Sequence, residues 1–270
     1  MKIFYFKKTL VLIFIIFLYL IVSRHIISFI FEDTKGSVHF ITEIAIKIPL
    51  IIFTIVLIKR ESSINIKYLF RNNIICAVLS IVMLYFSIQT TISKINHLNL
   101  EISLLDLYAY LFQCLSTGFF EELFFRTLIF VYICKYVNQT KPKNHYKQAI
   151  ITSALFAIVH LSGIFKGFDI ISIFNQILFA FSIGLLFQSV FFRVNNIIII
   201  SIIHALFNFH GMLKQKLFNI SSINNEVSTI EDFKETLITF FVLNIFIILP
   251  LMYFSLRKRN NFLLKTVDNL

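Results

Sequence analysis

The sequence predicts an all-α protein, a polytopic transmembrane helical bundle, from its composition and from the length of its apolar runs. The 270-residue chain is 58% hydrophobic, its mean hydropathy is +0.84, and it holds only 6 Gly and 3 Pro. A soluble domain of this size cannot hide so much apolar surface. Runs of about 20 apolar residues, long enough to cross a bilayer, recur along the chain. We therefore expect the lipid bilayer to surround most of it.

Eight apolar runs are candidate membrane spans, and we expect them to form a single membrane domain over residues 1–270. Lys7 and Lys8 precede the first run, but no small-residue cleavage site follows it, so we expect a retained anchor and not a signal peptide. The runs lie near residues 9–31, 38–58, 74–93, 104–134, 148–165, 170–192, 197–213 and 236–256.

The basic residues predict the orientation and explain the formal net charge of +11. With the N-terminus inside, 16 of the 25 Lys and Arg fall in inner segments, six in outer segments and three within spans. Because cytoplasmic loops are enriched in Lys and Arg, this distribution predicts an N-in, C-in topology, and no nucleic acid partner is needed. The abundance of Ile, Asn, Lys and Phe indicates an AT-rich bacterial genome, so we expect a multi-pass protein of a bacterial plasma membrane.

The fourth span holds three ionisable residues within six positions, Glu121, Glu122 and Arg126. Each charged side chain at the centre of an isolated span costs about 2.5–3.5 kcal/mol, so such residues are functional by default. Glu122 and Arg126 are spaced i, i+4, which predicts an ion pair on one helix face. A purely structural pair would explain these two residues. It leaves Glu121 as an additional buried carboxylate.

Two further spans carry histidines at helical spacing. Phe156 and His160 lie one turn apart in the fifth span, and His204 and Asn208 lie one turn apart in the seventh. At 1.5 Å per residue, Glu121, His160 and His204 fall at depths of about 20, 18 and 11 Å from the inner boundary. Either histidine alone is more typical of a hydrogen-bonded interior residue. Together with Glu121 and Asn208 they predict one shared cavity in the inner half of the membrane.

This set of side chains is suited to amide hydrolysis. A buried carboxylate and an imidazole facing one water can accept its proton while its oxygen attacks a carbonyl carbon. A second imidazole and a carboxamide can donate hydrogen bonds to the developing oxyanion. Alternatively, Glu121, His160 and His204 could bind zinc with an open position for water. The HExxH motif is absent, and the sequence leaves metal dependence open.

The three motifs, in this order and spacing, resemble the CAAX-protease and bacteriocin-processing (CPBP, or Abi) family of intramembrane peptidases. The resemblance covers about residues 104–213, which we expect to form the catalytic core. The family's motifs EExxxR, FxxxH and HxxxN are here Glu121-Glu122 to Arg126, Phe156 to His160 and His204 to Asn208. Many relatives have Gly after the motif Arg, where this chain has Thr127.

The resemblance implies an eight-helix membrane peptidase, of glutamate type or metallo type. The roles that it implies are water activation by Glu121 and His160, oxyanion binding by His204 and Asn208, and support by Glu122 and Arg126. We expect a peptide or membrane-protein substrate, in bacteriocin-related or signalling-peptide processing. Prenylated CAAX substrates are not expected in a bacterial host. The alternatives are a non-catalytic regulator or bacteriocin immunity protein of the same fold, and a proton-coupled transporter.

Other polar residues in the spans have simpler explanations. Cys76, Cys114 and Cys134 have no paired spacing, so they predict neither a disulfide framework nor a CxxC metal site. Asn175 and Gln176 in the sixth span either line the catalytic cavity or form hydrogen bonds between helices, and the second explanation is the simpler one.

Overall fold

The computed structural model of the chain is all-α, which confirms the predicted fold class. It describes residues 2–30, 36–61, 74–97, 102–137, 143–166, 169–194, 196–216 and 230–257. Three short segments depart from α-helical pitch and continue the helix before them: η2 (Leu123–Ile129), η3 (Val159–Lys166) and η5 (Asn244–Ile248). The α-helices are α1 (Lys2–Ile30), α2 (Ser37–Arg60), α3 (Ile74–His97), α4 (Leu104–Glu122), α5 (Phe130–Val137), α6 (Lys143–Ile158), α7 (Ile170–Val194), α8 (Ile197–Lys216), α9 (Ile230–Leu243) and α10 (Leu249–Arg257).

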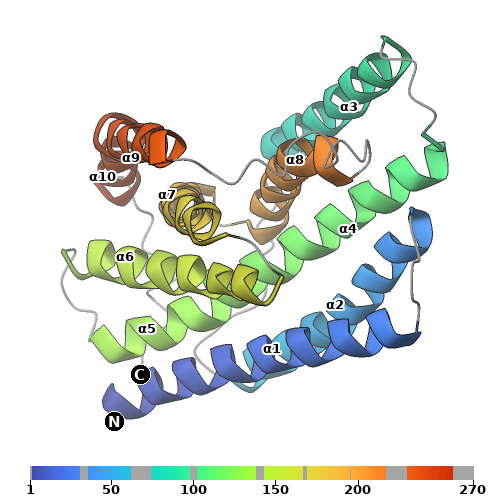
Figure 1. The fold of residues 1–270 in the computed structure, drawn as a ribbon. Coiled ribbons are helices and arrows are strands. Elements are labelled where there is room, and N and C mark those ends of the chain that lie inside the picture. The colour runs from blue at the N-terminus through green and yellow to red at the C-terminus, as the bar shows by residue number, and fades with distance from the viewer. Residues whose placement is uncertain are drawn as a thin grey trace.

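Each of the eight predicted spans corresponds to one helical rod. The fourth is the long rod formed by α4, η2 and α5, which runs diagonally through the molecule in Figure 1. Five helices are long and apolar enough to cross a membrane, namely Phe4–Ser23, Ser37–Arg60, Tyr146–Ile164, Ile170–Val194 and Glu231–Phe254. Two shorter apolar helices are Ile81–Ser93 and Ile197–Gly211. The chain is thus a multi-pass membrane protein, whose eight spans and N-in orientation stay predictions.

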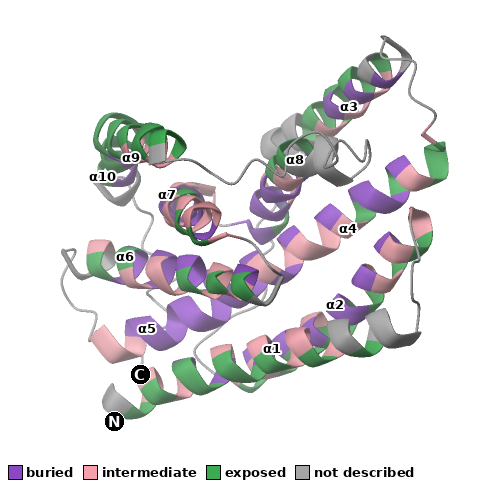
Figure 2. Cartoon of the chain, in the orientation of Figure 1, coloured by how far each residue is buried: buried purple, intermediate pink, exposed green. Residues whose placement is uncertain are grey.

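Burial is concentrated on the central rod. Every residue of η2 is buried, and α5 and the neighbouring part of α4 are the main buried region in Figure 2. The peripheral helices expose large apolar side chains instead; Phe14 is 63% exposed, Ile81 64% and Phe246 72%. Exposed apolar surface on this scale is typical of a protein whose solvent is lipid.

Small residues let the helices that carry the site approach closely. A Cβ on Gly118 of α4 would lie 2.7 Å from the Ser201 carbonyl oxygen and 3.1 Å from the Ala205 nitrogen, both in α8. On the neighbouring pair of helices, a Cβ on Gly184 of α7 would lie 3.1 Å from the Ser153 Cβ of α6. Close backbone approach through small residues is a common way for membrane helices to associate. The close approach at Gly118 holds α8 against α4 one turn before Glu121 and Glu122.

Polar groups away from the fourth span are also accommodated. Glu43 and Lys47 of α2 form a buried i, i+4 ion pair with a distance of 3.0 Å between Nζ and Oε2. Cys114 and Cys134 are buried and form no disulfide in the described part of the chain. The side chain of Cys76 lies outside the described residues.

Because the α4 and α8 backbones approach closely at Gly118, we expect even the methyl group of alanine to destabilise the protein at this position. Gly118→Ala should lower the temperature at which the detergent-solubilised protein aggregates, because overpacking costs about 1–3 kcal/mol. The matched control is Gly211→Ala in α8, where a Cβ would meet nothing within 4 Å. Equal thermal stability of the two variants would contradict the proposed contact between α4 and α8.

Candidate active site

The central rod changes pitch at the sequence motif that predicted the site. α4 ends at Glu122, and the π-helical segment η2 begins at Leu123 and contains Arg126. A π-helical turn is strained and rare, and it occurs frequently at functional sites. The pitch changes directly after the two glutamates, so Glu121 and Glu122 are the last residues with regular α-helical geometry.

The predicted ion pair between Glu122 and Arg126 is present and fully buried. Arg126 Nε donates to Glu122 Oε2 at 2.8 Å, and both side chains have 0% exposure. The guanidinium carbon lies 5.1 Å from the ring centroid of Phe156, a cation–π contact from α6. Within the described part of the chain, Arg126 Nη1 and Nη2 are buried without a hydrogen-bond partner. The pair therefore fixes one carboxylate in the core, against α6.

His204 of α8 joins the two glutamates. Its Nδ1 donates to Glu122 Oε1 at 2.8 Å, and its Nε2 lies 3.4 Å from Glu121 Oε2. The side chain of Glu122 is inaccessible, whereas that of Glu121 is 26% exposed. The adjacent glutamates thus differ in environment. Glu122 is a buried anchor for Arg126 and His204, and Glu121 is the carboxylate that another molecule can reach.

The charges of this cluster determine how many protons it must hold. Two carboxylates and one guanidinium carry a net charge of −1, which is costly in a membrane interior. One proton shared between His204 Nε2 and Glu121 makes the cluster neutral. The imidazole of His204 therefore lies between the buried carboxylate and the accessible one.

His160 and His204 both contact the ring of Phe156. Its Nδ1 donates to the Phe156 carbonyl oxygen at 3.1 Å, at the point where α6 tightens into the 3₁₀ segment η3. Ring centroids are 5.1 Å apart for His160 and Phe156, and 6.0 Å apart for Phe156 and His204. With a hydrogen on Nδ1, Nε2 of His160 carries the lone pair and can accept a proton.

Asn208 lies one turn after His204 in α8. Its main-chain carbonyl accepts a hydrogen bond from the Tyr110 hydroxyl at 3.1 Å, which ties this part of α8 to α4. No hydrogen bond joins the Asn208 side chain to another described residue, and the side chain is half-buried. Of the four predicted catalytic residues, the structure brings Glu121 and His204 into direct contact. It connects His160 to them through Phe156, and Asn208 through the helix.

Two residues of this region were missed by the sequence analysis. Phe187 of α7 packs against the His204 ring with a centroid distance of 5.1 Å, and Tyr110 supports the backbone at Asn208. Phe187 is one of 34 Phe, and nothing in its sequence context separates it from the others. Tyr110 had a weak signal, because a buried tyrosine hydroxyl inside a span needs a hydrogen-bond partner.

Whether the site can hold a metal ion depends on how its His, Cys, Asp and Glu side chains are arranged. Among the described residues, no three His, Cys, Asp or Glu side chains are arranged to hold a metal. Glu121 and His204 are close enough to share one ion, but His160 completes no three-ligand set with them in this arrangement. We therefore derive the chemistry from the protein side chains alone.

The buried ion pair predicts an asymmetric response to mutation. Arg126→Met leaves Glu122 as an uncompensated buried charge, and breaking a buried pair in this way costs about 3–5 kcal/mol. The double variant E122Q/R126M removes both charges, and the new amide oxygen can still accept from His204 Nδ1. The double variant should unfold at a higher temperature in detergent than Arg126→Met does. A single variant as stable as the wild type would show that the pair does not hold the core.

Comparison with known proteins identifies this core. Residues 103–210 match the family model described as Rce1-like, type II CAAX prenyl endopeptidase Rce1-like. No curated protein and no solved structure gives a significant match to the chain. The matched residues include all three motifs. They also include Glu121, Glu122, Arg126 and His204, whose side chains contact one another in the structure. It confirms the resemblance: residues 103–210 of this multi-pass membrane protein form a core similar to the Rce1-like model, which is a model of the CPBP family.

Proposed function

We propose that the protein is an intramembrane endopeptidase that hydrolyses a peptide bond with a water molecule activated by Glu121 and His160. One observation carries the proposal: the accessible carboxylate of Glu121 lies 3.4 Å from the His204 imidazole, inside an otherwise buried charged cluster. The match to a family of membrane endopeptidases supports the same reaction class.

The first step is attack by water on the scissile carbonyl carbon. Glu121 accepts a proton from the water, with His160 Nε2 as the second acceptor, and the water oxygen forms a bond to the carbon. The carbonyl becomes a tetrahedral oxyanion. His204, protonated on both nitrogens, and the Asn208 carboxamide donate hydrogen bonds to it. Glu122 stabilises the imidazolium form of His204, because its carboxylate accepts from Nδ1 at 2.8 Å.

The second step breaks the carbon–nitrogen bond. The proton taken from water passes from Glu121 to the leaving amine, and the products are a carboxylic acid and an amine. No covalent intermediate forms, so Glu121 returns to its starting state. Arg126 and Glu122 do not touch the substrate in this scheme. They act by holding His204 in place.

For the substrate, we propose a peptide or membrane protein cleaved near the cytoplasmic leaflet, in bacteriocin-related or signalling-peptide processing in a bacterial plasma membrane. The description of the matched family names CAAX prenyl endopeptidases. The composition of this chain indicates a bacterial genome, where prenylated CAAX substrates are not expected. A prenylated CAAX peptide is therefore tested beside unmodified peptides.

The test is peptide cleavage by the purified full-length protein in detergent. Glu121→Gln keeps the size of the side chain and removes the base, so we expect the cleavage rate to fall by at least about 10²-fold, the effect typical of a general base. The cleavage rate of His160→Ala should fall by a similar factor. The matched control is His210→Asn, on the same helix as His204, since the hydrogen bond given for the His210 side chain is the one with Ser87 of α3 at 2.6 Å. Full activity in Glu121→Gln would disprove the assignment.

The proposed oxyanion donor gives a separate expectation. Asn208→Ala should lower the turnover number by about 10²–10³-fold, because one hydrogen-bond donor to the transition state is lost. Its effect on the Michaelis constant should be small, since this donor acts mainly on the transition state. A variant with raised Michaelis constant and unchanged turnover would instead show that Asn208 binds the substrate.

Metal dependence is read from the same assay. If Glu121 and His160 act without a metal, dialysis against a chelator should leave the cleavage rate unchanged. Loss of activity that added zinc restores would overturn the metal-free mechanism and favour the set Glu121, His160 and His204 as ligands. A wild-type protein that cleaves no peptide in the panel, with Glu121→Gln leaving its cellular phenotype intact, would favour a non-catalytic regulator or immunity protein.

A further inference from the structure

Buried serine and threonine side chains in the helices fall into two groups. In the first group the hydroxyl donates to the main-chain carbonyl four residues earlier, as Thr54 of α2 does to Leu50 at 2.8 Å. Back-bonding of this kind lets a helix satisfy a hydroxyl by itself. Thr127, Thr152 and Ser153 are equally buried, but their hydroxyl oxygens have no hydrogen-bond partner in the described part of the chain. Their own helices therefore do not satisfy them.

Two longer side chains belong to this second group. Gln188 of α7 has 0% exposure, and both its amide oxygen and its amide nitrogen lack a hydrogen-bond partner among the described residues. The same holds for Nη1 and Nη2 of Arg126, whose Nε donates to Glu122. We call these groups the internal polar cluster: the side chains of Thr127, Thr152, Ser153 and Gln188, and the two Nη atoms of Arg126.

A close contact between α6 and α7 brings part of the internal polar cluster together. A Cβ on Gly184 of α7 would lie 3.3 Å from Ser153 Oγ of α6, so the two helices nearly touch at this point. Gln188 follows Gly184 by one turn on the same face of α7. The Gln188 amide and the Ser153 hydroxyl therefore belong to the same helix interface.

A second contact connects this interface to the central rod. The Arg126 guanidinium carbon lies 5.1 Å from the ring centroid of Phe156. Thr152 precedes Phe156 by one turn on the same face of α6, and Thr127 follows Arg126 directly in η2. The internal polar cluster therefore occupies the junction of η2, α6 and α7, next to the buried side of the charged cluster.

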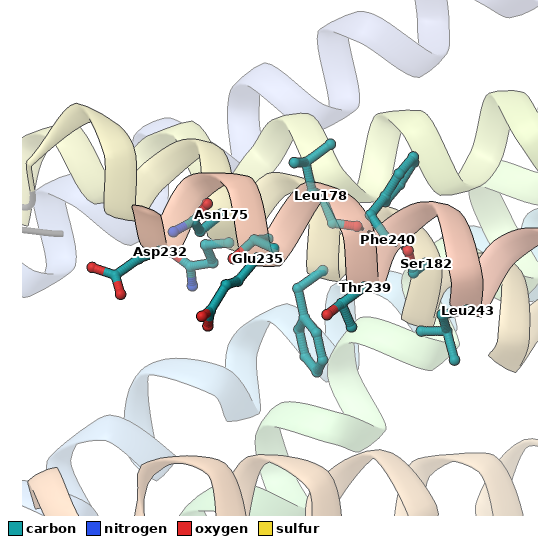
Figure 3. Close-up of a pocket in the computed structure, with 11 residues that line it drawn as sticks. Asn175, Leu178, Ser182, Asp232, Glu235, Thr239, Phe240 and Leu243 are labelled. Carbon is teal, nitrogen blue, oxygen red and sulfur yellow. Dashed lines mark hydrogen bonds between the residues drawn. The ribbon is translucent and has the colours of Figure 1, made fainter. Parts of the chain in front are cut away.

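Polar side chains elsewhere on α7 have a different environment. Asn175, Gln176 and Ser182 line a pocket of about 520 Å³ between α7 and α9, and Figure 3 shows side chains from both helices along it. Asn175 and Gln176 are only partly buried, and Ser182 accepts a hydrogen bond from Asn244 at 2.7 Å. Gln188 does not line this pocket. The pocket thus accounts for the polarity of one part of α7 and leaves Gln188 unexplained.

The chemistry of the internal polar cluster selects its ligand. The guanidinium offers only donors, whereas the hydroxyls and the Gln188 amide both donate and accept. A metal ion would find no carboxylate, imidazole or thiolate in this set, and the positive charge of Arg126 would repel it. An anion would meet the carboxylate of Glu122, which lies 2.8 Å from Arg126 Nε. Water carries no charge and both donates and accepts, so it fits every member.

We propose that the internal polar cluster binds water molecules, which accept from Arg126 Nη1 and Nη2 and bond to the hydroxyls of α6 and the amide of Gln188. Polar groups inside a membrane protein must be satisfied internally, because lipid offers them no partner. A buried water typically makes about three hydrogen bonds to such groups. The bound water completes the hydrogen bonding of the guanidinium and so allows a cation to remain in the core. This site is independent of the peptidase assignment.

A threonine-to-valine exchange in the full-length protein distinguishes a hydrated cluster from a dry one. In Thr152→Val, a hydroxyl that bonds to water is lost, so the unfolding temperature in detergent should fall by about 2–4 °C. Removal of a hydroxyl without any partner would instead raise it. The matched control is Thr54→Val, which should leave it nearly unchanged, because the Leu50 carbonyl keeps its helical hydrogen bond. An unchanged or higher unfolding temperature of Thr152→Val would overturn the proposal.

Radiolytic labelling detects the water directly. An X-ray pulse converts bound water into hydroxyl radicals that oxidise the nearest side chains, and water enriched in heavy oxygen marks the product. Phe156 contacts Arg126 and should take up the label, whereas Phe40 of α2, like Phe156 only 3% exposed, should not. Thr152→Val and Gln188→Met should both lower the label at Phe156, which separates internal water from water that arrives beside Glu121. An unlabelled Phe156, or equal labelling in wild type and variants, would also refute the site.

Discussion

The buried contact between Glu122, Arg126 and His204 is the constraint on which the rest of the site depends. A lone carboxylate, guanidinium or imidazolium is expensive at this depth, so each of the three groups needs the others. They come from the central rod and from α8, and satisfying them fixes the rotation of α8 against α4. Gly118 permits the approach, because any side chain there would meet the α8 backbone. Packing and electrostatics therefore select the same arrangement.

This constraint separates the roles of two neighbouring glutamates. In a regular helix successive residues point about 100° apart, so Glu122 can face the core while the side chain of Glu121 stays 26% exposed. The π-helical segment begins directly afterwards and keeps Arg126 within 2.8 Å of Glu122. The buried Glu122 binds His204 Nδ1, and the accessible Glu121 lies beside Nε2 of the same ring. The Glu122–Arg126 ion pair thus helps to position Glu121, which is not part of the pair.

The sequence was sufficient for the fold class and for the Glu122–Arg126 ion pair, because both follow from the cost of charge in lipid. Apolar run length predicted the helical rods, and the i, i+4 spacing predicted the Glu122–Arg126 pair. Spacing could not show that His204 contacts both glutamates, since this depends on how α8 is rotated against α4. Nor could it assign Asn175 and Gln176 to the α7–α9 pocket, because two polar residues in one span carry no information on which helix they face.

α7 is the element that links the charged cluster to the α7–α9 pocket. Gly184 packs against Ser153 of α6 and Phe187 against the His204 ring, while Ser182 bonds to Asn244 at the start of η5. Any molecule that enters the α7–α9 pocket could alter catalysis only if it bound two positions of α7 with different affinity. The close contact at Gly184 leaves little room for α7 to move relative to α6. A shift at Phe187 would therefore require α6, and with it His160, to move as well.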